Sequence, residues 1–247
     1  MRNLLFLPMF ILVLMCSVNF SSANVLIENI NTNSRESSEI GFFAGTIDTG
    51  EGNVGDFVLF SCAAFNAESS SLFNSPAPGL WTELDEGSCG GGGKFCRHGI
   101  WGGFTNTTNN QEITCSWTNE SNVFAAGSMR YINVDPINPI IDVACNSGVG
   151  ETSGGLATAP SINTEAGSQV IQIFTLGGPN ERGRAISDPQ LQLNASETES
   201  WFIGADGSFQ VLISNGESNL ILEDGPTNPT TLEVAPQTEW RACTVAL

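Results

Sequence analysis

Two short runs, Phe57-Val58-Leu59-Phe60 and Val170-Ile171-Gln172-Ile173-Phe174, decide the fold class of this 247-residue chain. Successive side chains of a strand point to opposite faces of its sheet. A strand that is apolar at both its odd and its even positions is therefore expected to be covered on both faces. The two runs therefore predict central strands packed on both sides. No stretch of about twelve residues elsewhere combines helical apolar spacing with capping residues.

Further candidate strands surround these runs and are separated by clusters of Gly, Pro, Asn and Asp. We expect strands over 40–47, 56–65, 80–84, 95–104, 112–117, 123–134, 140–145, 170–176, 209–214, 220–222 and 240–247. Many short strands separated by turn chemistry are typical of a sandwich or barrel. The sequence therefore predicts an all-β chain with a single antiparallel β-sandwich domain over 39–247, preceded by a flexible lead over 24–38.

The first 23 residues have the pattern of a secretory signal peptide. Arg2 precedes the apolar run 4–18, and Ser21-Ser22-Ala23 supplies small residues before a cut after Ala23. The run is shorter than the roughly 20 residues of a membrane-spanning helix, and no comparable run follows it. We expect a secreted, extracellular or cell-surface protein without membrane insertion.

The charge balance narrows the classes of partner. The chain has 26 Asp and Glu against 8 Lys and Arg, for a net charge of −18, and Lys94 is the only lysine. Binding to nucleic acid needs clustered cations that neutralise phosphates, so a nucleic-acid partner is not expected. Self-repulsion that keeps an external protein in solution is the favoured interpretation of the charge, and calcium binding is the alternative.

The cysteines predict disulfides. Cys16 leaves with the signal peptide, and an even set remains in an exported chain. This set comprises Cys62, Cys89, Cys96, Cys115, Cys145 and Cys243. Six cysteines allow 15 pairings. The flexible segment Gly90-Gly91-Gly92-Gly93 favours a Cys89–Cys96 pair, which leaves three pairings open for the other four cysteines.

An ordered set of short signatures carries a resemblance to a known family. The set runs through Gly55-Asp56-Phe57-Val58-Leu59-Phe60, Pro78-Gly79-Leu80-Trp81-Thr82, Ile100-Trp101, Thr114-Cys115-Ser116-Trp117, Arg130-Tyr131-Ile132-Asn133-Val134-Asp135, Pro139-Ile140-Ile141-Asp142, Ala159-Pro160-Ser161-Ile162-Asn163-Thr164 and 239–247. It resembles the jelly-roll, concanavalin-like β-sandwich of phage structural and tail-associated proteins and of exported bacterial surface proteins. The resemblance implies a fold and an extracellular or virion setting, and it transfers no catalytic residue.

Residues that could support catalysis are few. His98 is the only histidine, and no G-x-S-x-G motif surrounds a serine, so a hydrolase triad is not expected. A structural zinc site needs four ligands at a typical spacing, and Cys89, Cys96 and His98 provide neither. The favoured interpretation is therefore a disulfide and a surface histidine. Glu83 and Asp85 would project to one face of a strand, as the two carboxylates of a glycoside hydrolase require. The segment resembles the E-x-D-x-x-E strand of sandwich-fold β-glucanases, but Ser88 stands in place of the last carboxylate.

Several further residues are candidates for binding. Oxygen-rich turns around Asp48, Glu51 and Asp56, and around Asp135 and Asp142, are the candidate calcium sites, and no other cofactor is expected. Trp81, Trp101, Trp117 and Trp240 are expected in the core, whereas Trp201 is the candidate for stacking on a sugar. The sequons at Asn106, Asn119 and Asn194 are candidate glycosylation sites.

The sequence thus predicts a non-enzymatic secreted β-sandwich with a structural or adhesive role at the cell exterior or on a virus particle. Its expected partner is a surface glycan or another extracellular protein, or a second copy of the chain. A carbohydrate-binding module, with calcium as a candidate ion, is the alternative. A polysaccharide hydrolase built on Glu83 and Asp85 is the third hypothesis.

Overall fold

The computed structural model describes residues 25–36, 42–65, 73–74, 76, 80–90, 96–121, 123–150, 155–177, 191–192, 199–205, 209–214, 221–234 and 238–247. Throughout these residues every paired strand is antiparallel and no helix is present, so the all-β prediction is confirmed. The predicted signal peptide, residues 1–23, lies outside the described residues.

The first half of the chain forms two sheets. Its strands are β1 (Leu26–Glu36), β2 (Phe42–Asp48), β3 (Phe57–Phe65), β4 (Phe73–Asn74), β5 (Thr82–Ser88), β6 (Cys96–Phe104), β7 (Glu112–Ser121) and β8 (Val123–Ile132). One sheet has the order β1-β8-β3-β6-β5, and the other has the order β2-β7-β4. Residues 26–36, expected as a flexible lead, form the edge strand β1, because their backbone pairs with β8 although their side chains give little strand signal.

The second half forms three sheets. Its strands are β9 (Asp142–Val149), β10 (Gly155–Ala159), β11 (Asn163–Thr164), β12 (Val170–Gly177), β13 (Leu191–Gln192), β14 (Glu199–Ala205), β15 (Phe209–Ser214), β16 (Gly225–Pro226), β17 (Thr230–Val234) and β18 (Glu239–Ala246). Their orders are β14-β15-β12-β18-β9, β10-β17-β13 and β11-β16.

The two halves repeat the same strand order. When the short pair β11-β16 is set aside, the five-stranded order β9-β18-β12-β15-β14 corresponds strand for strand to β1-β8-β3-β6-β5. The three-stranded order β10-β17-β13 corresponds in the same way to β2-β7-β4. The chain is therefore built from two halves of equivalent topology, which the sequence did not reveal.

The turns before β3 and β12 repeat as well. Gly55 and Gly167 occupy the third position of these turns with φ of 90° and 95°, a conformation that glycine adopts without strain. In each turn the backbone N–H of the first residue donates to the side chain of the fourth, from Asn53 to Asp56 and from Glu165 to Ser168. The repeat therefore extends to matching hydrogen bonds.

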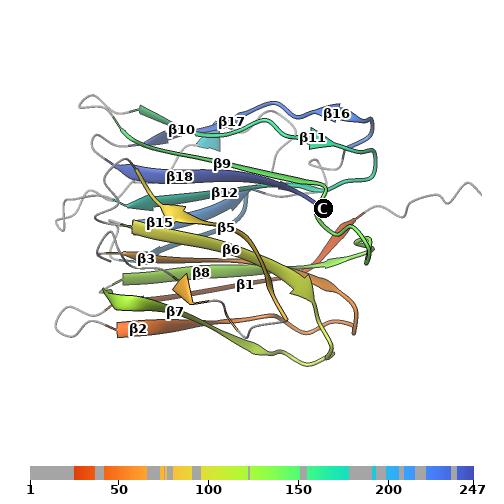
Figure 1. Ribbon diagram of the computed structural model, residues 1–247, viewed down its shortest axis with the longest axis horizontal. Helices are drawn as coiled ribbons and strands as arrows, with labels where there is room; N and C mark the ends of the chain where they lie inside the picture. The colour runs from red at the N-terminus through yellow and green to blue at the C-terminus, as the bar shows by residue number, and fades with distance from the viewer. Residues whose placement is uncertain are drawn as a thin grey trace, which may run out of the picture.

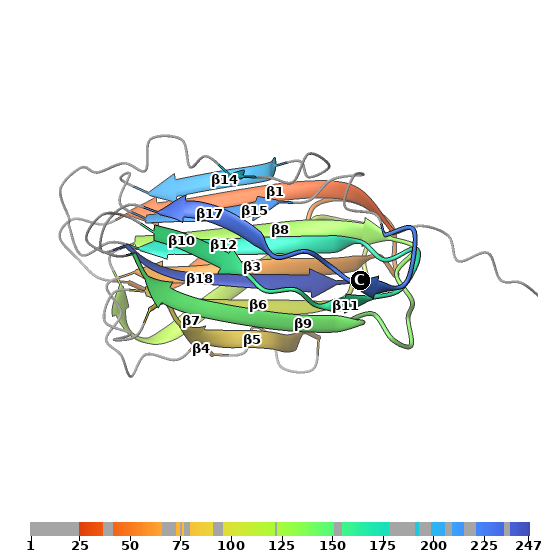
Figure 2. The same ribbon diagram turned by 90° about the horizontal axis from the view of Figure 1, so that it is seen from above.

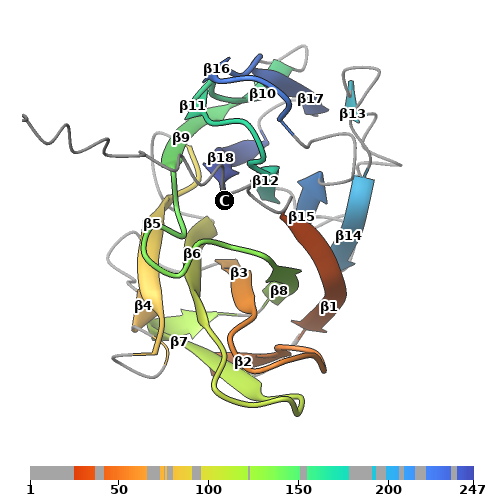
Figure 3. The same ribbon diagram turned by 90° about the vertical axis from the view of Figure 1, so that its right-hand side faces the viewer.

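The sheets stack in four layers with three apolar cores between them. The central core lies between the two five-stranded sheets and includes Phe57, Leu59, Met129, Ile171 and Ile173. A second core separates β2-β7-β4 from the first five-stranded sheet, and a third separates β10-β17-β13 from the second. Figure 1 shows the strands along the long axis, Figure 2 shows β10 and β17 over the strands behind them, and Figure 3 shows the layers end-on.

The predicted central strands lie inside this stack. In β3, Phe57 and Leu59 face the central core, whereas Val58 and Phe60 face the second core. In β12, Ile171 and Ile173 face the central core, and Phe174 faces the third. Both strands are thus covered on both faces, as predicted from the apolar residues at both their odd and their even positions. The expectation of one two-layer sandwich is corrected, because each half contributes its own sandwich and their inner sheets share a core.

The six cysteines form three disulfides, which confirms the prediction of disulfide bonding. They are Cys62–Cys115, Cys89–Cys96 and Cys145–Cys243. The first joins the two sheets of the first half, from β3 to β7, and the third joins the adjacent strands β9 and β18. Trp81, Trp101 and Trp117 are buried in the second core, and Trp240 packs against the third.

Candidate functional site

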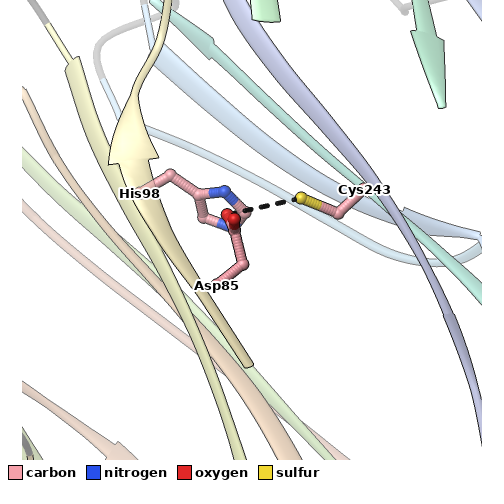
Figure 4. Close-up of side chains that lie close together, drawn as sticks. All are labelled: Asp85, His98 and Cys243. Carbon is pink, nitrogen blue, oxygen red and sulfur yellow. Dashed lines mark hydrogen bonds between the residues drawn. The ribbon is translucent and has the colours of Figure 1, made fainter. Parts of the chain in front are cut away.

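A polar cluster lies between the inner sheets of the two halves. We call the side chains of Ser61 on β3, Asp85 on β5, His98 on β6, and Arg241 and Cys243 on β18 the interface cluster. Asp85, His98 and Cys243 each direct one candidate ligand atom to within 4.8 Å of the other two. Figure 4 shows these three side chains pointing toward one another from different strands. The stacking of the halves therefore creates this site, because no single half contains all of it.

An ion pair between Asp85 and Arg241 joins the halves. The Nε of Arg241 donates to Oδ2 of Asp85 at 2.7 Å, and Nη2 donates to Oδ1 at 2.6 Å. This two-pronged geometry is the strong form of a guanidinium–carboxylate contact. Gly87 makes room for it, since a Cβ there would lie 2.5 Å from the guanidinium carbon. Both charged side chains are mostly buried, with 15% of Arg241 and 16% of Asp85 exposed.

A β-bulge in β5 directs Asp85 into the cluster. The pairing with β6 shifts between Glu83, opposite Trp101, and Asp85, opposite Ile100. Trp101 belongs to the second core and Ile100 to the central core, so the bulge places the two carboxylates on opposite faces of the sheet. Partial burial raises the pKa of the exposed Glu83, and the nearby Glu86 and Asp85 charges add to the increase. The expected carboxylate pair is therefore not formed.

His98 lies wholly inside the protein, which corrects the expectation of a surface histidine. Its Nε2 lies 2.9 Å from Oγ of Ser61, and both residues are 0% exposed. Burial lowers the pKa of His98 to about 4; the Asp85 charge opposes this shift and the Arg241 charge adds to it. The imidazole is therefore neutral at pH 7. Its Nδ1 has no hydrogen-bond partner.

The cluster contains a serine, a histidine and an aspartate, the residue types of a hydrolase triad. Its Ser61–His98 contact resembles the first link of such a triad, but a nucleophilic hydroxyl must reach its substrate. Ser61 and His98 are both fully enclosed between the inner sheets. In this closed arrangement the Ser61–His98 contact joins the neighbouring strands β3 and β6 of the first half, and the Asp85–Arg241 ion pair joins the two halves.

Cys243 is bonded to Cys145 on the neighbouring strand β9. Its Sγ lies 3.7 Å from Oδ2 of Asp85, the contact that is dashed in Figure 4. A disulfide sulfur carries no proton, so in the oxidised protein this is a packing contact and Sγ donates nothing to the carboxylate. The same bond withholds the thiolate that a metal ion would require.

One of the candidate calcium residues of the first half, Asp56, binds a buried arginine. Arg130 on β8 is 0% exposed, and its guanidinium donates to five oxygens at 2.6–3.1 Å. These oxygens belong to the carboxylate of Asp56, the carbonyls of Gly50, Asn53 and Thr107, and the hydroxyl of Thr105. The guanidinium thus occupies the point where these oxygens converge. The side chains of Asp48 and Glu51 remain exposed nearby in sequence.

Asp135 and Asp142 both accept hydrogen bonds from backbone N–H groups, Asp135 in the linker between the halves and Asp142 at the start of β9. Asp135 accepts from Ile137 at 2.8 Å, whereas Asp142 accepts from Val143 at 2.8 Å and from Asn163 at 3.0 Å. Asp135 therefore caps its own turn, whereas Asp142 also joins β9 to β11.

A cleft of about 400 Å³, which we call the linker cleft, opens beside Asp135. Polar side chains of Asn133, Asp135, Asn138 and Glu165 line it together with the apolar residues Val25 and Leu247. Four groups that can bond hydroxyls over an apolar surface suit a small polar ligand. Asp135 could be singled out from the sequence, but the cleft could not be predicted, because its walls come from residues far apart in the chain.

The remaining candidates are only partly described. Trp201 belongs to β14 and Asn119 to β7, but their side chains lie outside the described residues. Asn106 is exposed in the turn after β6, and Asn194 lies outside the described residues.

The interface cluster was missed because its members are scattered over the sequence. Ser61 and Arg241 were not singled out, and no spacing connects either of them to His98. Ser61 and Arg241 each occur among apolar residues of a predicted strand, and this position could have indicated a buried polar cluster, since buried polar side chains need partners.

Comparison with known protein families, curated protein sequences and solved structures finds no match to this chain. No helix among the described residues has the length and apolar character that crossing a membrane requires.

Proposed function

We propose that this chain is a non-enzymatic exported protein with a structural or adhesive role, at the cell exterior or on a virus particle. The observation that carries the proposal is the construction of the body. Two sandwich halves share a central core, three disulfides fasten the strands, and the Asp85–Arg241 ion pair links the halves. Such a stiff body suits passive attachment.

The strand order supports the same proposal. In the first half, the consecutive strands β1 to β4 alternate between two sheets of order β1-β8-β3-β6-β5 and β2-β7-β4, and the second half repeats this pattern. This alternation supports a jelly-roll-like wrapping, an architecture found in viral capsid and lectin domains, although β5 and β6 lie in the same sheet. It agrees with the resemblance carried by the sequence signatures. Full pairing of six cysteines fits an oxidising compartment, and the signal-like residues 1–23 supply a route to it.

Carbohydrate binding is the second candidate function, and the linker cleft favours it. Amide and carboxylate groups of Asn133, Asp135, Asn138 and Glu165 can bond sugar hydroxyls, and the half-buried Ile140 and Ile141 can contact a sugar face. Two of these groups are carboxylates, so a calcium ion could assist binding at this cleft.

One set of measurements separates the two candidates. The mature chain, residues 24–247, is examined by light scattering for self-association, by pull-down with cells and particles, and on a glycan array with calcium or a chelator. Self-association or attachment without glycan binding supports the structural role. Glycan binding that is lost in Asp135→Asn/Glu165→Gln, with an unchanged circular dichroism spectrum, supports the second candidate. A chain that neither self-associates nor binds any of these partners overturns the proposal.

A further inference from the structure

The interface cluster contains an unused ligand atom, Nδ1 of His98. Asp85 and His98 lie beside a disulfide whose sulfur, Sγ of Cys243, is within 4.8 Å of one ligand atom from each. The imidazole binds Ser61 through Nε2 and keeps Nδ1 without a partner, although His98 is 0% exposed. A buried nitrogen without a partner is costly, and its presence beside two other ligand types indicates a second state of the cluster in which it is used.

We propose that reduction of the Cys145–Cys243 disulfide converts the interface cluster into a tetrahedral site for a zinc-like divalent cation. The four ligands are Sγ of Cys145, Sγ of Cys243, an imidazole nitrogen of His98 and a carboxylate oxygen of Asp85. Zinc takes four ligands of these three types in a tetrahedron.

The distances suit such a site after a small contraction. With metal–ligand bonds of about 2.0–2.3 Å, the ligand atoms of a tetrahedral zinc site are roughly 3.3–3.8 Å apart. The three groups already lie within 4.8 Å of one another. Cys145 and Cys243 are directly paired residues of β9 and β18, so both sulfurs are available at the same place once the bond between them is broken.

The contacts around the ligands also suit a metal site. Ser61 holds the second imidazole nitrogen of His98, and Arg241 holds the carboxylate of Asp85. Hydrogen bonds of this kind orient metal ligands and fix the histidine tautomer. The cluster therefore needs no new support for the ligands.

Protons, electrons and charge balance in the conversion. A dithiol or phosphine reductant supplies two electrons, two protons are taken up, and the S–S bond becomes two thiols. Binding of the cation releases two thiol protons to solvent. Two thiolates, the Asp85 carboxylate, the divalent cation and the Arg241 guanidinium then sum to zero, as Asp85 and Arg241 do in the oxidised protein. Neither state therefore buries an uncompensated charge.

Cobalt(II) is the probe, since its thiolate charge-transfer and tetrahedral d–d absorption bands report sulfur ligands directly. The mature chain is titrated with cobalt, oxidised or after reduction by a phosphine, and zinc is then added. We expect one equivalent of tetrahedral cobalt in the reduced protein only, displaced by zinc. The variants His98→Gln and Asp85→Asn should weaken cobalt binding by at least about ten-fold. Cys145→Ser/Cys243→Ser should abolish the thiolate band.

The double variant Cys89→Ser/Cys96→Ser is the matched control, because it removes another thiol pair and retains the proposed ligands. It should bind cobalt as the wild type does. Equal binding by Cys145→Ser/Cys243→Ser, or no binding by the reduced folded protein, overturns the proposal. If the reduced protein unfolds without metal, refolding under reducing conditions with zinc is measured by circular dichroism. Recovery with zinc in the wild type and not in Cys145→Ser/Cys243→Ser supports the site, and no recovery in either overturns it.

Discussion

Arg241 of the second half donates two hydrogen bonds, of 2.7 and 2.6 Å, to the carboxylate of Asp85 in the first half. From this contact we predict how substitutions of the two residues change the free energy of unfolding. Arg241→Met leaves Asp85 mostly buried without its counter-charge and should lower the free energy of unfolding by about 3 kcal/mol, measured by urea denaturation. Addition of Asp85→Asn to that variant should recover part of the loss, because the uncompensated charge is removed. Additive effects of the two substitutions would show that the pair is not coupled.

Arg130 should be the most sensitive charged residue of the first half. Arg130→Met removes the guanidinium from the Asp56 carboxylate and four other oxygens, so we expect a loss of about 4 kcal/mol in the free energy of unfolding. Arg130→Lys keeps the charge but cannot reach all five oxygens, and should recover less than half of this loss. Thermal and urea denaturation measure both variants. A lysine variant as stable as the wild type would show that charge alone matters.

The buried His98 should make stability depend on pH. Its pKa is about 4 in the folded protein, against an ordinary value near 6.5. Between these values the unfolded state binds more protons, so the unfolding free energy rises with pH. This contribution is fully present above about pH 6.5 and is lost as the pH falls to about 4, with a size of about 3 kcal/mol. Urea denaturation from pH 4 to 7 should show a shallower pH dependence for His98→Gln than for the wild type; identical slopes would contradict the prediction.

The disulfides should differ in their contribution to stability according to the chain length they enclose. Cys62–Cys115 and Cys145–Cys243 have sequence separations of 53 and 98, against 7 for Cys89–Cys96. The chain-entropy estimate gives about 4 to 5 kcal/mol for either long loop and about 2 kcal/mol for the short one. Paired Cys→Ala substitutions and urea denaturation test this order. A larger loss from the Cys89–Cys96 pair would reverse it.

The shared central core predicts that neither half is complete alone. Residues 24–134 expressed without 135–247 would expose the face that carries Phe57, Leu59 and Met129. Each separate half should therefore self-associate, and refolding both together should give a one-to-one complex. Size-exclusion chromatography with light scattering measures the species. Two soluble monomeric halves with native circular dichroism would contradict the shared core.

The local features of the fold could be predicted because short segments determine them. The runs that form β3 and β12 are apolar at both odd and even positions, which predicts burial of both faces. The even number of cysteines predicts disulfides, and the glycine-rich spacer between Cys89 and Cys96 favours their pairing. The edge strand β1 could not be predicted, since residues 26–36 are mostly polar, pair through their backbone and carry little side-chain signal. The bulge between Glu83 and Asp85 could not be predicted either, because it arises from the register in which β5 pairs with β6.

The sequence by itself determined an all-β, disulfide-bonded, strongly acidic chain. The apolar pattern of each strand and the turn residues lie within short segments, and the composition depends on no contact between segments. Only the tertiary structure decided that the strands form two halves of equivalent topology, since strand order depends on pairings between distant segments. It also decided the roles of individual polar residues: Asp56 binds the buried Arg130, and His98 lies among Ser61, Asp85 and Arg241. The partner of a buried polar group is set by which sheets face each other, and that is a property of the whole fold.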